Sequence, residues 1–239
     1  MGKIKALFLD MDDTVLDFER SERESISHVL RSFGIEPTDD ILQLYHKINA
    51  GQWKLLEKGV FTRDEILTRR FRLLFGKLKI RADVFAVQSL YESTLAESAY
   101  FMDGAEDFLE CAARRYRLFL ASNGTEYVQR RRIELSGIGR FFENIFISGE
   151  IGFNKPAPEF FNIALEKCGG LEAGECVMIG DSLSSDILGG RNAGMKTVYL
   201  NRTPGSAKNL PVVPDVSVSD IRQAGVALEY IEILCAQEE

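Results

Sequence analysis

The sequence has little of the chemistry that zinc sites and disulfide-bonded folds require. Its four cysteines are far apart and form no Cys-x-x-Cys pair: Cys111, Cys168, Cys176 and Cys235. This spacing disfavours both kinds of site, and we interpret all four as buried free thiols of a protein in a reducing compartment. There are only two histidines, His28 and His46, and neither has a second candidate ligand nearby in the sequence.

Long hydrophobic runs and an excess of positive charge are also missing. No stretch approaches the roughly 20 apolar residues that span a bilayer, and the N-terminal apolar run stops at Asp10, too early for a signal peptide. We therefore expect a cytoplasmic protein without membrane partners. The formal net charge of −7 disfavours nucleic acid as a partner, although a local lysine or metal ion can still attract a small anionic substrate.

What the sequence does contain is typical of a globular enzyme, with 45% apolar and 27% charged residues. Residues 17–96 show four successive helical patterns with short connections, which predicts a small helical bundle. The pattern Thr62-x-x-Glu65 is a capping box at the start of its third helix. Gly51 and Gly59 indicate a connection that carries the only tryptophan, Trp53.

Buried strands and helices alternate outside this bundle. The expected strands are Ala6–Leu9, Leu118–Ala121, Ile145–Ile147, Val177–Ile179 and Thr197–Leu200. Repeated β-α units predict an α/β, Rossmann-like fold, with a parallel sheet and helices on both faces. We expect residues 1–16 and 97–239 to form this core, and residues 17–96 to be a helical domain inserted into it.

Two carboxylates follow the first expected strand. Asp10 and Asp12 lie on the same side of an extended chain, where their charges repel unless a cation sits between them. A hard divalent cation such as Mg²⁺ suits an all-oxygen site, and ligands bind beyond the carboxyl ends of strands in open α/β sheets. The alternative interpretation is a polar turn after a strand.

Three weaker signals follow other strands. Ser122-Asn123 offers a hydroxyl and backbone N–H groups before a helix, which suits an anion but is also common in turns. Lys155 lies on a loop, where most lysines are solvated, and Asp181 and Asp186 could merely cap a helix. The triplet Arg130–Arg132 points in diverging directions on a helix, so we interpret it as a solvated face.

The order of these signals is more specific than any one of them. Asp-x-Asp-x-Thr, then Ser-Asn, then Lys-Pro, then Gly-Asp-Ser-x-x-x-Asp resembles the four-part signature of the haloacid dehalogenase-like superfamily over nearly the whole chain. The resemblance implies a phosphatase that uses Mg²⁺ and an aspartyl-phosphate intermediate, with residues 17–96 as a mobile helical cap.

The resemblance also assigns roles to the acids. Asp10 is the implied nucleophile and a metal ligand, and Asp181 is a second metal ligand. Asp12 lends its backbone carbonyl to the metal, while its side chain protonates the leaving oxygen and later takes a proton from water. Dehalogenases resemble this pattern but lack the second acid, because a halide leaves without a proton, so Asp12 favours cleavage of phosphate esters.

The other motif residues have implied roles around the phosphoryl group. Ser122 and the Asn123 backbone bind its oxygens, and Lys155 offsets the negative charge of the nucleophile and the phosphoryl group. Asp186 supports the metal ligands, and Thr14 orients the loop after the first strand by hydrogen bonds.

Several segments are similar to the pyrimidine 5′-nucleotidase subgroup: residues 10–18, 116–124, 147–156 and 185–194. This similarity favours a nucleoside monophosphate as the substrate, with Phe18 or Trp53 as an aromatic contact, although a lone tryptophan also packs small bundles. The alternatives are a broad sugar-phosphate phosphatase and a non-catalytic phospholigand-binding protein. We expect a monomer or a small homo-oligomer.

Overall fold

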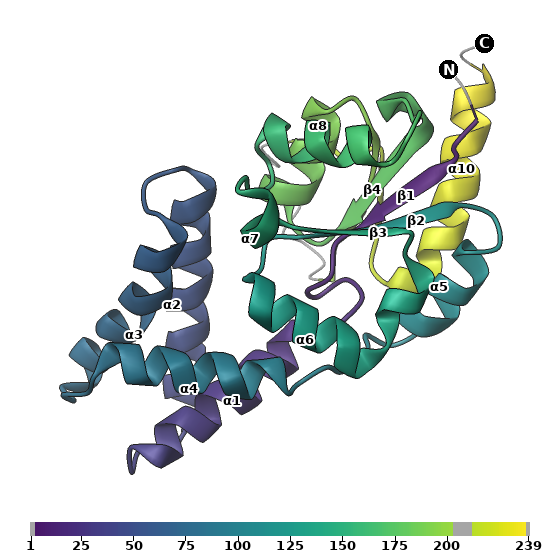
Figure 1. Cartoon of the computed structure of the whole chain (residues 1–239). Helices are drawn as coiled ribbons and strands as arrows, with labels where there is room; N and C mark the ends of the chain where they lie inside the picture. Colours follow the sequence, from purple (N-terminus) through teal and green to yellow (C-terminus); the bar gives the residue numbers. More distant parts are fainter. Residues whose placement is uncertain (1–2, 203–211, 238–239) are drawn as a thin grey trace. The chain divides into compact units, whose positions relative to one another are not determined.

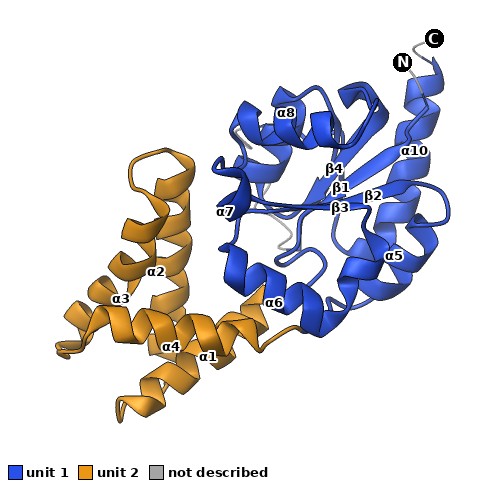
Figure 2. Cartoon of the chain, viewed as in Figure 1, with its two compact units in different colours: residues 1–17, 100–239 blue, residues 18–99 orange. Residues whose placement is uncertain are grey.

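The computed structural model describes residues 3–202 and 212–237. The chain forms two compact units, one of residues 1–17 and 100–239 and the other of residues 18–99 (Figures 1 and 2). Within the described part of the chain, no helix combines the length and apolar character that crossing a membrane requires.

The larger unit contains the predicted parallel sheet. Its strands are β1 (Ala6–Leu9), β2 (Arg117–Ser122), β3 (Asn144–Ile147), β4 (Cys176–Gly180), β5 (Lys196–Leu200) and β6 (Val216–Val218). They lie in the order β3-β2-β1-β4-β5-β6, and every neighbouring pair is parallel. This confirms the Rossmann-like fold; β6 was not expected, because three residues give too short an alternating pattern to read.

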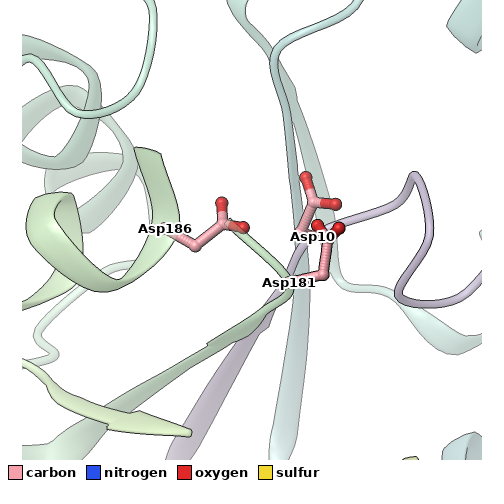
Figure 3. Close-up of side chains that lie close together, drawn as sticks. All are labelled: Asp10, Asp181 and Asp186. Atoms are coloured by element: carbon pink, nitrogen blue, oxygen red, sulfur yellow. The ribbon is translucent and has the colours of Figure 1, made fainter. Parts of the chain in front are cut away.

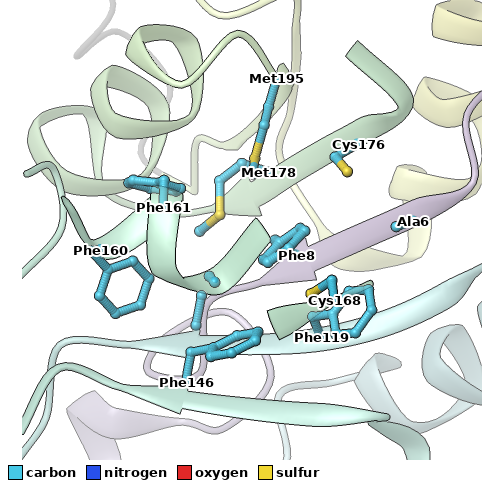
Figure 4. Close-up of a cluster of buried hydrophobic side chains, with 12 residues drawn as sticks. Ala6, Phe8, Phe119, Phe146, Phe160, Phe161, Cys168, Cys176, Met178 and Met195 are labelled. Atoms are coloured by element: carbon cyan, nitrogen blue, oxygen red, sulfur yellow. The ribbon is translucent and has the colours of Figure 1, made fainter. Parts of the chain in front are cut away.

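The central strand β1 is buried on both faces, as its apolar run predicts. Ala6 and Phe8 belong to a cluster on one face that also holds Phe119 of β2, Phe146 of β3 and Phe160 of α8 (Pro158–Lys167) (Figure 4). The ring centroids of Phe8 and Phe119 are 5.0 Å apart. This packing fixes which residues of β1 face the cluster, and Asp10 follows directly after the last residue of the strand.

Helices cover both faces of the sheet (Figure 1). Besides α8, the larger unit has α5 (Ala105–Ala112), α6 (Glu126–Ser136), α7 (Ser148–Ile151), α9 (Leu188–Asn192) and α10 (Ala224–Gln237). Shorter turns are η1 (Ile138–Phe141), η2 (Ala173–Glu175), η4 (Ile221–Gln223) and the π-helical η3 (Leu183–Ile187). The helical segments that follow β2 and β4, which are α6 and η3, therefore begin a few residues after the strand ends that carry polar residues.

The smaller unit consists of the four expected helices, α1 (Phe18–Ser32), α2 (Asp39–Glu57), α3 (Arg63–Leu78) and α4 (Val84–Ala96). The capping box of α3 is confirmed, with Thr62 and Glu65 bonding each other's backbone N–H groups. The connection expected around Trp53 is wrong, because α2 continues through Gly51 to Glu57. A helix tolerates one glycine at a cost of about 1 kcal/mol, which the packing of α2 against α3 offsets.

One cysteine departs from the expectation of burial. Cys168, Cys176 and Cys235 are buried, but Cys111 is exposed, because the buried residues of α5 are Ala105, Phe108, Leu109 and Ala112. Burial raises the pKa of Cys168 and of Cys176 to about 12, so both stay protonated at neutral pH.

We therefore expect one thiol per native chain to react rapidly with Ellman's reagent at pH 8, and the other three to react only on unfolding. Cys111→Ser should remove the rapid phase. Two or more rapid thiols in the native protein would contradict the burial of the other three cysteines.

Candidate active site

The carboxyl ends of β1, β2 and β4 hold the polar residues singled out in the sequence. Asp10 follows β1, Ser122 is the last residue of β2, and Asp181 follows β4. The strand order reverses between β1 and β4, since β2 and β3 lie on one side of β1 and the later strands on the other. Such a switch point opens a crevice where α/β sheets bind ligands.

The loop after β1 is held by its backbone. The N–H groups of Val15 and Leu16 both donate to the carbonyl of Met11, at 3.0 and 2.8 Å, and Asp13 turns the chain with a left-handed φ of 58°. Thr14 is buried, yet its hydroxyl has no hydrogen-bond partner among the described residues. The Thr14 side chain therefore does not make the hydrogen bonds that were expected to orient the loop. Main-chain bonds close the loop, and side-chain contacts of its acids hold it further, such as the Arg202–Asp13 ion pair at 3.3 Å.

Lys155 is buried at the centre of the site. Its ammonium donates to the carboxylates of Asp10 and Asp186, each at 2.7 Å, and to the carbonyl of Ala121 at 2.5 Å. Burial opposes the charge, but the two carboxylates outweigh it and raise the pKa of Lys155. Asn123 holds the lysine in place through two 2.8 Å bonds, donating to its backbone carbonyl and accepting from its N–H.

Asp186 reaches the site from the π-helical turn after β4. One of its carboxylate oxygens accepts from Lys155 and the other from the backbone N–H of Ser182, at 3.0 Å. A side chain on Gly180 would come within 2.2 Å of this carboxylate, so the glycine lets Asp186 approach the end of β4. The sequence spacing Gly-Asp-Ser-x-x-x-Asp thus builds one side of the site.

Asp10, Asp181 and Asp186 form an acidic cluster in which one carboxylate oxygen from each lies within 4.8 Å of the others (Figure 3). Burial, assisted by Asp186 and Asp12 and opposed by Lys155, raises the pKa of Asp10 to about 8. Burial and the neighbouring Asp10 and Asp186 also raise the pKa of Asp181 well above its ordinary value. Three carboxylates face the Lys155 ammonium, and the Arg202 guanidinium lies 3.9 Å from Asp181. The carboxylate oxygens form an all-oxygen donor set that fits a divalent cation such as Mg²⁺.

The Asp12 side chain is not part of this cluster. It is held by two residues of α6 whose contacts with it were not expected from the sequence. Its carboxylate accepts from Arg132 on one oxygen and from Gln129 on the other, at 2.7 Å for the glutamine. Gln129 also donates to the hydroxyl of Ser122, at 2.6 Å. Asp12, just after β1, and Ser122, at the end of the neighbouring strand β2, are therefore joined through the Gln129 side chain of α6.

The interpretation of the arginine triplet as a solvated face is wrong for Arg132, whose side chain is fully buried. Arg130 is exposed and Arg131 partly exposed, as expected for a solvated face, because successive helical residues diverge. The same divergence turns the third arginine inward. Its spacing of four residues from Val128, which is also buried, was the signal that could have placed it on the buried stripe.

The two candidate substrate contacts lie in the other unit. Trp53 is half-buried and packs against Leu56, Ile66 and Leu67. Phe18 is the first residue of α1 and is also partly buried. Their contact with a substrate stays a prediction.

Comparisons with known proteins agree with this geometry. The family model of the haloacid dehalogenase-like hydrolases matches residues 4–194. YfnB of Bacillus subtilis is 33% identical over 224 residues, or 93% of this chain and 94% of YfnB. A crystal structure of YfnB bound to magnesium has a TM-score of 0.89 and 32% identity, and the match covers 95% of this chain and 99% of that one.

Two curated relatives have names that state a substrate. The pyrimidine 5′-nucleotidase PynA of Streptococcus pneumoniae is 32% identical over 198 residues, or 82% of this chain and 84% of PynA. The glyceraldehyde 3-phosphate phosphatase of Pyrococcus abyssi is 31% identical over 208 residues, or 82% of this chain and 81% of that protein. The resemblance seen in the four motifs is confirmed, and this chain belongs to the haloacid dehalogenase-like hydrolases.

Proposed function

We propose that this hydrolase is a Mg²⁺-dependent phosphomonoesterase that acts through an aspartyl-phosphate on Asp10. The observation that carries the proposal is the joint burial of Asp10 and Lys155 beside Asp181 and Asp186 at the switch point of the sheet. A carboxylate that attacks a phosphate dianion meets strong repulsion, and cations at the site offset it. Lys155 supplies one positive charge within 2.7 Å of the nucleophile.

The side chains present can carry both halves of the reaction. The Asp10 carboxylate attacks phosphorus, the ester P–O bond breaks, and Asp12 gives its proton to the leaving oxygen. Water then attacks the aspartyl-phosphate, Asp12 accepts a proton from that water, and inorganic phosphate is released. Ser122 and the Asn123 backbone bind the phosphoryl oxygens in this scheme, and Asp186 holds Lys155.

Asp10, Asp181 and the Asp12 backbone carbonyl are the proposed ligands of Mg²⁺. When bound, the ion supplies a second positive charge that stabilises the phosphoryl oxygens in the transition state. The acidic cluster supports this assignment, as does the magnesium in the YfnB crystal structure.

Nucleoside 5′-monophosphates are the substrate class we favour, because the similarity to PynA covers most of both chains. The match to a glyceraldehyde 3-phosphate phosphatase makes sugar and triose phosphates the second candidate class. We infer that residues 18–99 act as the cap that selects between them, with Phe18 or Trp53 as a base contact.

A phosphate-release screen with Mg²⁺ present tests the function. It should compare kcat/KM across pyrimidine and purine nucleoside monophosphates, sugar phosphates and triose phosphates. Higher values for nucleotides support the first class, and higher values for sugar or triose phosphates support the second. Binding of these compounds without any phosphate release would favour a non-catalytic protein instead.

Removal of the metal should abolish activity, and Mg²⁺ should restore it. Below pH 8 the Asp10 carboxyl group of the metal-free protein holds a proton, since its pKa is raised to about 8. A cation must displace that proton, so Mg²⁺ affinity should fall from pH 8 to pH 6, by up to about tenfold per pH unit for each carboxyl proton displaced. Titration calorimetry in buffers of different ionisation enthalpy measures this. Affinity that is equal at pH 6 and pH 8 would contradict it.

A further inference from the structure

A buried arginine and a buried glutamine hold the Asp12 side chain from α6. Arg132 donates to one carboxylate oxygen and Gln129 donates to the other. The side chain of Arg132 is 0% exposed and that of Asp12 is 27% exposed, so Asp12 is the member of the pair that solvent reaches. Two donors on two oxygens fix both the position and the rotation of the carboxylate.

The surrounding residues are shaped for this contact. A side chain on Gly124 would come within 2.3 Å of the Gln129 side chain, so only glycine leaves room for the glutamine. The Gln129 amide oxygen accepts from Arg132 at 3.3 Å, while its nitrogen donates to Asp12 and to Ser122. The charged Arg132 side chain thereby orients Gln129. Gln129 in turn links Asp12, the proposed proton-transfer residue, to Ser122, the proposed phosphate-binding residue.

Burying a guanidinium group costs several kcal/mol unless an anion compensates it. A salt bridge that served stability alone would be replaceable by apolar residues, whereas this one lies against the second carboxylate of the Asp-x-Asp motif. The arrangement is also different from the metal cluster, because the Asp12 side chain is not among the three carboxylates that converge there.

We infer that Arg132 and Gln129 are positioning residues that hold the Asp12 carboxylate where it exchanges its proton with the leaving oxygen and with the attacking water. The inference rests on the proposed function. Without them the Asp12 carboxyl group rotates freely, so proton transfer to the leaving oxygen and from the attacking water slows. The attack of Asp10 on a phosphate ester whose leaving group needs no proton is not slowed.

The dependence on the leaving group separates these steps. An alkyl phosphate must have its leaving alkoxide protonated as the P–O bond breaks, whereas p-nitrophenolate leaves without a proton. In Arg132→Met we expect kcat/KM for alkyl phosphates to fall by roughly 100-fold, the low end of general acid catalysis. For p-nitrophenyl phosphate we expect kcat/KM to change by less than about fivefold, since this constant reports only steps up to phosphoryl transfer.

Hydrolysis of the aspartyl-phosphate is common to both substrates and needs Asp12 as a base. Arg132→Met should therefore release p-nitrophenol in a burst of about one equivalent per site, followed by slow turnover. Arg132→Lys should recover part of the activity on alkyl phosphates. Asp12→Asn should show the same split between substrates, and adding Arg132→Met to it should cause little further loss.

The neighbouring Arg131→Met is the matched control, because that side chain is partly exposed and bonds Glu134, away from Asp12; it should leave both substrates unaffected. Arg132→Gln, which removes the charge but keeps a polar group at the buried position, provides a second variant if Arg132→Met does not fold. Equal losses on both substrates, or no loss on either, would overturn the inference while the proposed function stood. A wild-type protein that hydrolyses neither substrate would instead overturn the proposed function.

Discussion

Replacing Asp10 with asparagine is expected to abolish phosphate release, lowering kcat by roughly 10⁴-fold or more. The carboxylate of Asp10 forms the bond to phosphorus, and a neutral amide of the same shape does not. Lys155 stays in place in the variant through Asp186 and the Ala121 carbonyl. Steady-state phosphate release at saturating Mg²⁺ measures the effect, and an asparagine variant as active as the wild type would remove Asp10 as the nucleophile.

The thermal stability of this variant shows whether the loss is chemical. The pKa of Asp10 is raised to about 8 by burial, so the folded state binds more protons than the unfolded state between pH 4 and pH 8. The contribution of Asp10 to wild-type stability therefore falls across that range as pH rises, and asparagine removes this penalty. We expect Asp10→Asn to melt at or above the wild-type temperature at neutral pH, with a difference that grows up to pH 8. A variant that melts lower at pH 8 than the wild type would contradict this.

Predictions from the hydrophobic pattern were confirmed where they depend on a single strand or helix. The run Ala6–Leu9 is apolar at every position, which is the pattern of a strand buried on both faces, and it became the central strand. The end of that strand then places Asp10. Because parallel strands meet with their carboxyl ends at one edge, the motifs after β2 and β4 came together there too.

What the sequence did not reveal depends on contacts between distant segments. The role of Asn123 in clamping the Lys155 backbone joins residues 32 positions apart, and no local pattern encodes it. Arg132 was missed because a charged side chain is normally solvated, and its burial follows only from a partner 120 positions away. The family signature assigns neither the contact of Asn123 with the Lys155 backbone nor the contact of Arg132 with Asp12.

Lys155→Met should be the most destabilising change in the site as well as a strong loss of activity. Removing one partner of a buried ion pair costs about 3–5 kcal/mol, because the remaining charges are left without compensation. Asp10 and Asp186 would then face each other and Asp181 with no ammonium between them. We also expect kcat to fall by roughly 10²–10³-fold, the range for loss of one donor that stabilises developing charge.

The pH dependence of that destabilisation identifies its cause. Over pH 5–9 the wild-type lysine stays charged, since its pKa is raised above an already basic value. Loss of the ammonium raises the pKa of the acids around it still further, so the folded variant binds more protons and loses more stability as pH rises. Urea unfolding at pH 5 and pH 8 measures the free energy of unfolding of Lys155→Met and of the wild type, and the difference between them should be larger at pH 8. The control Lys167→Met, at an exposed position of α8, should have the wild-type free energy of unfolding at both pH values. A loss that is independent of pH would mean that Lys155 contributes through packing, and the electrostatic account of the site would be wrong.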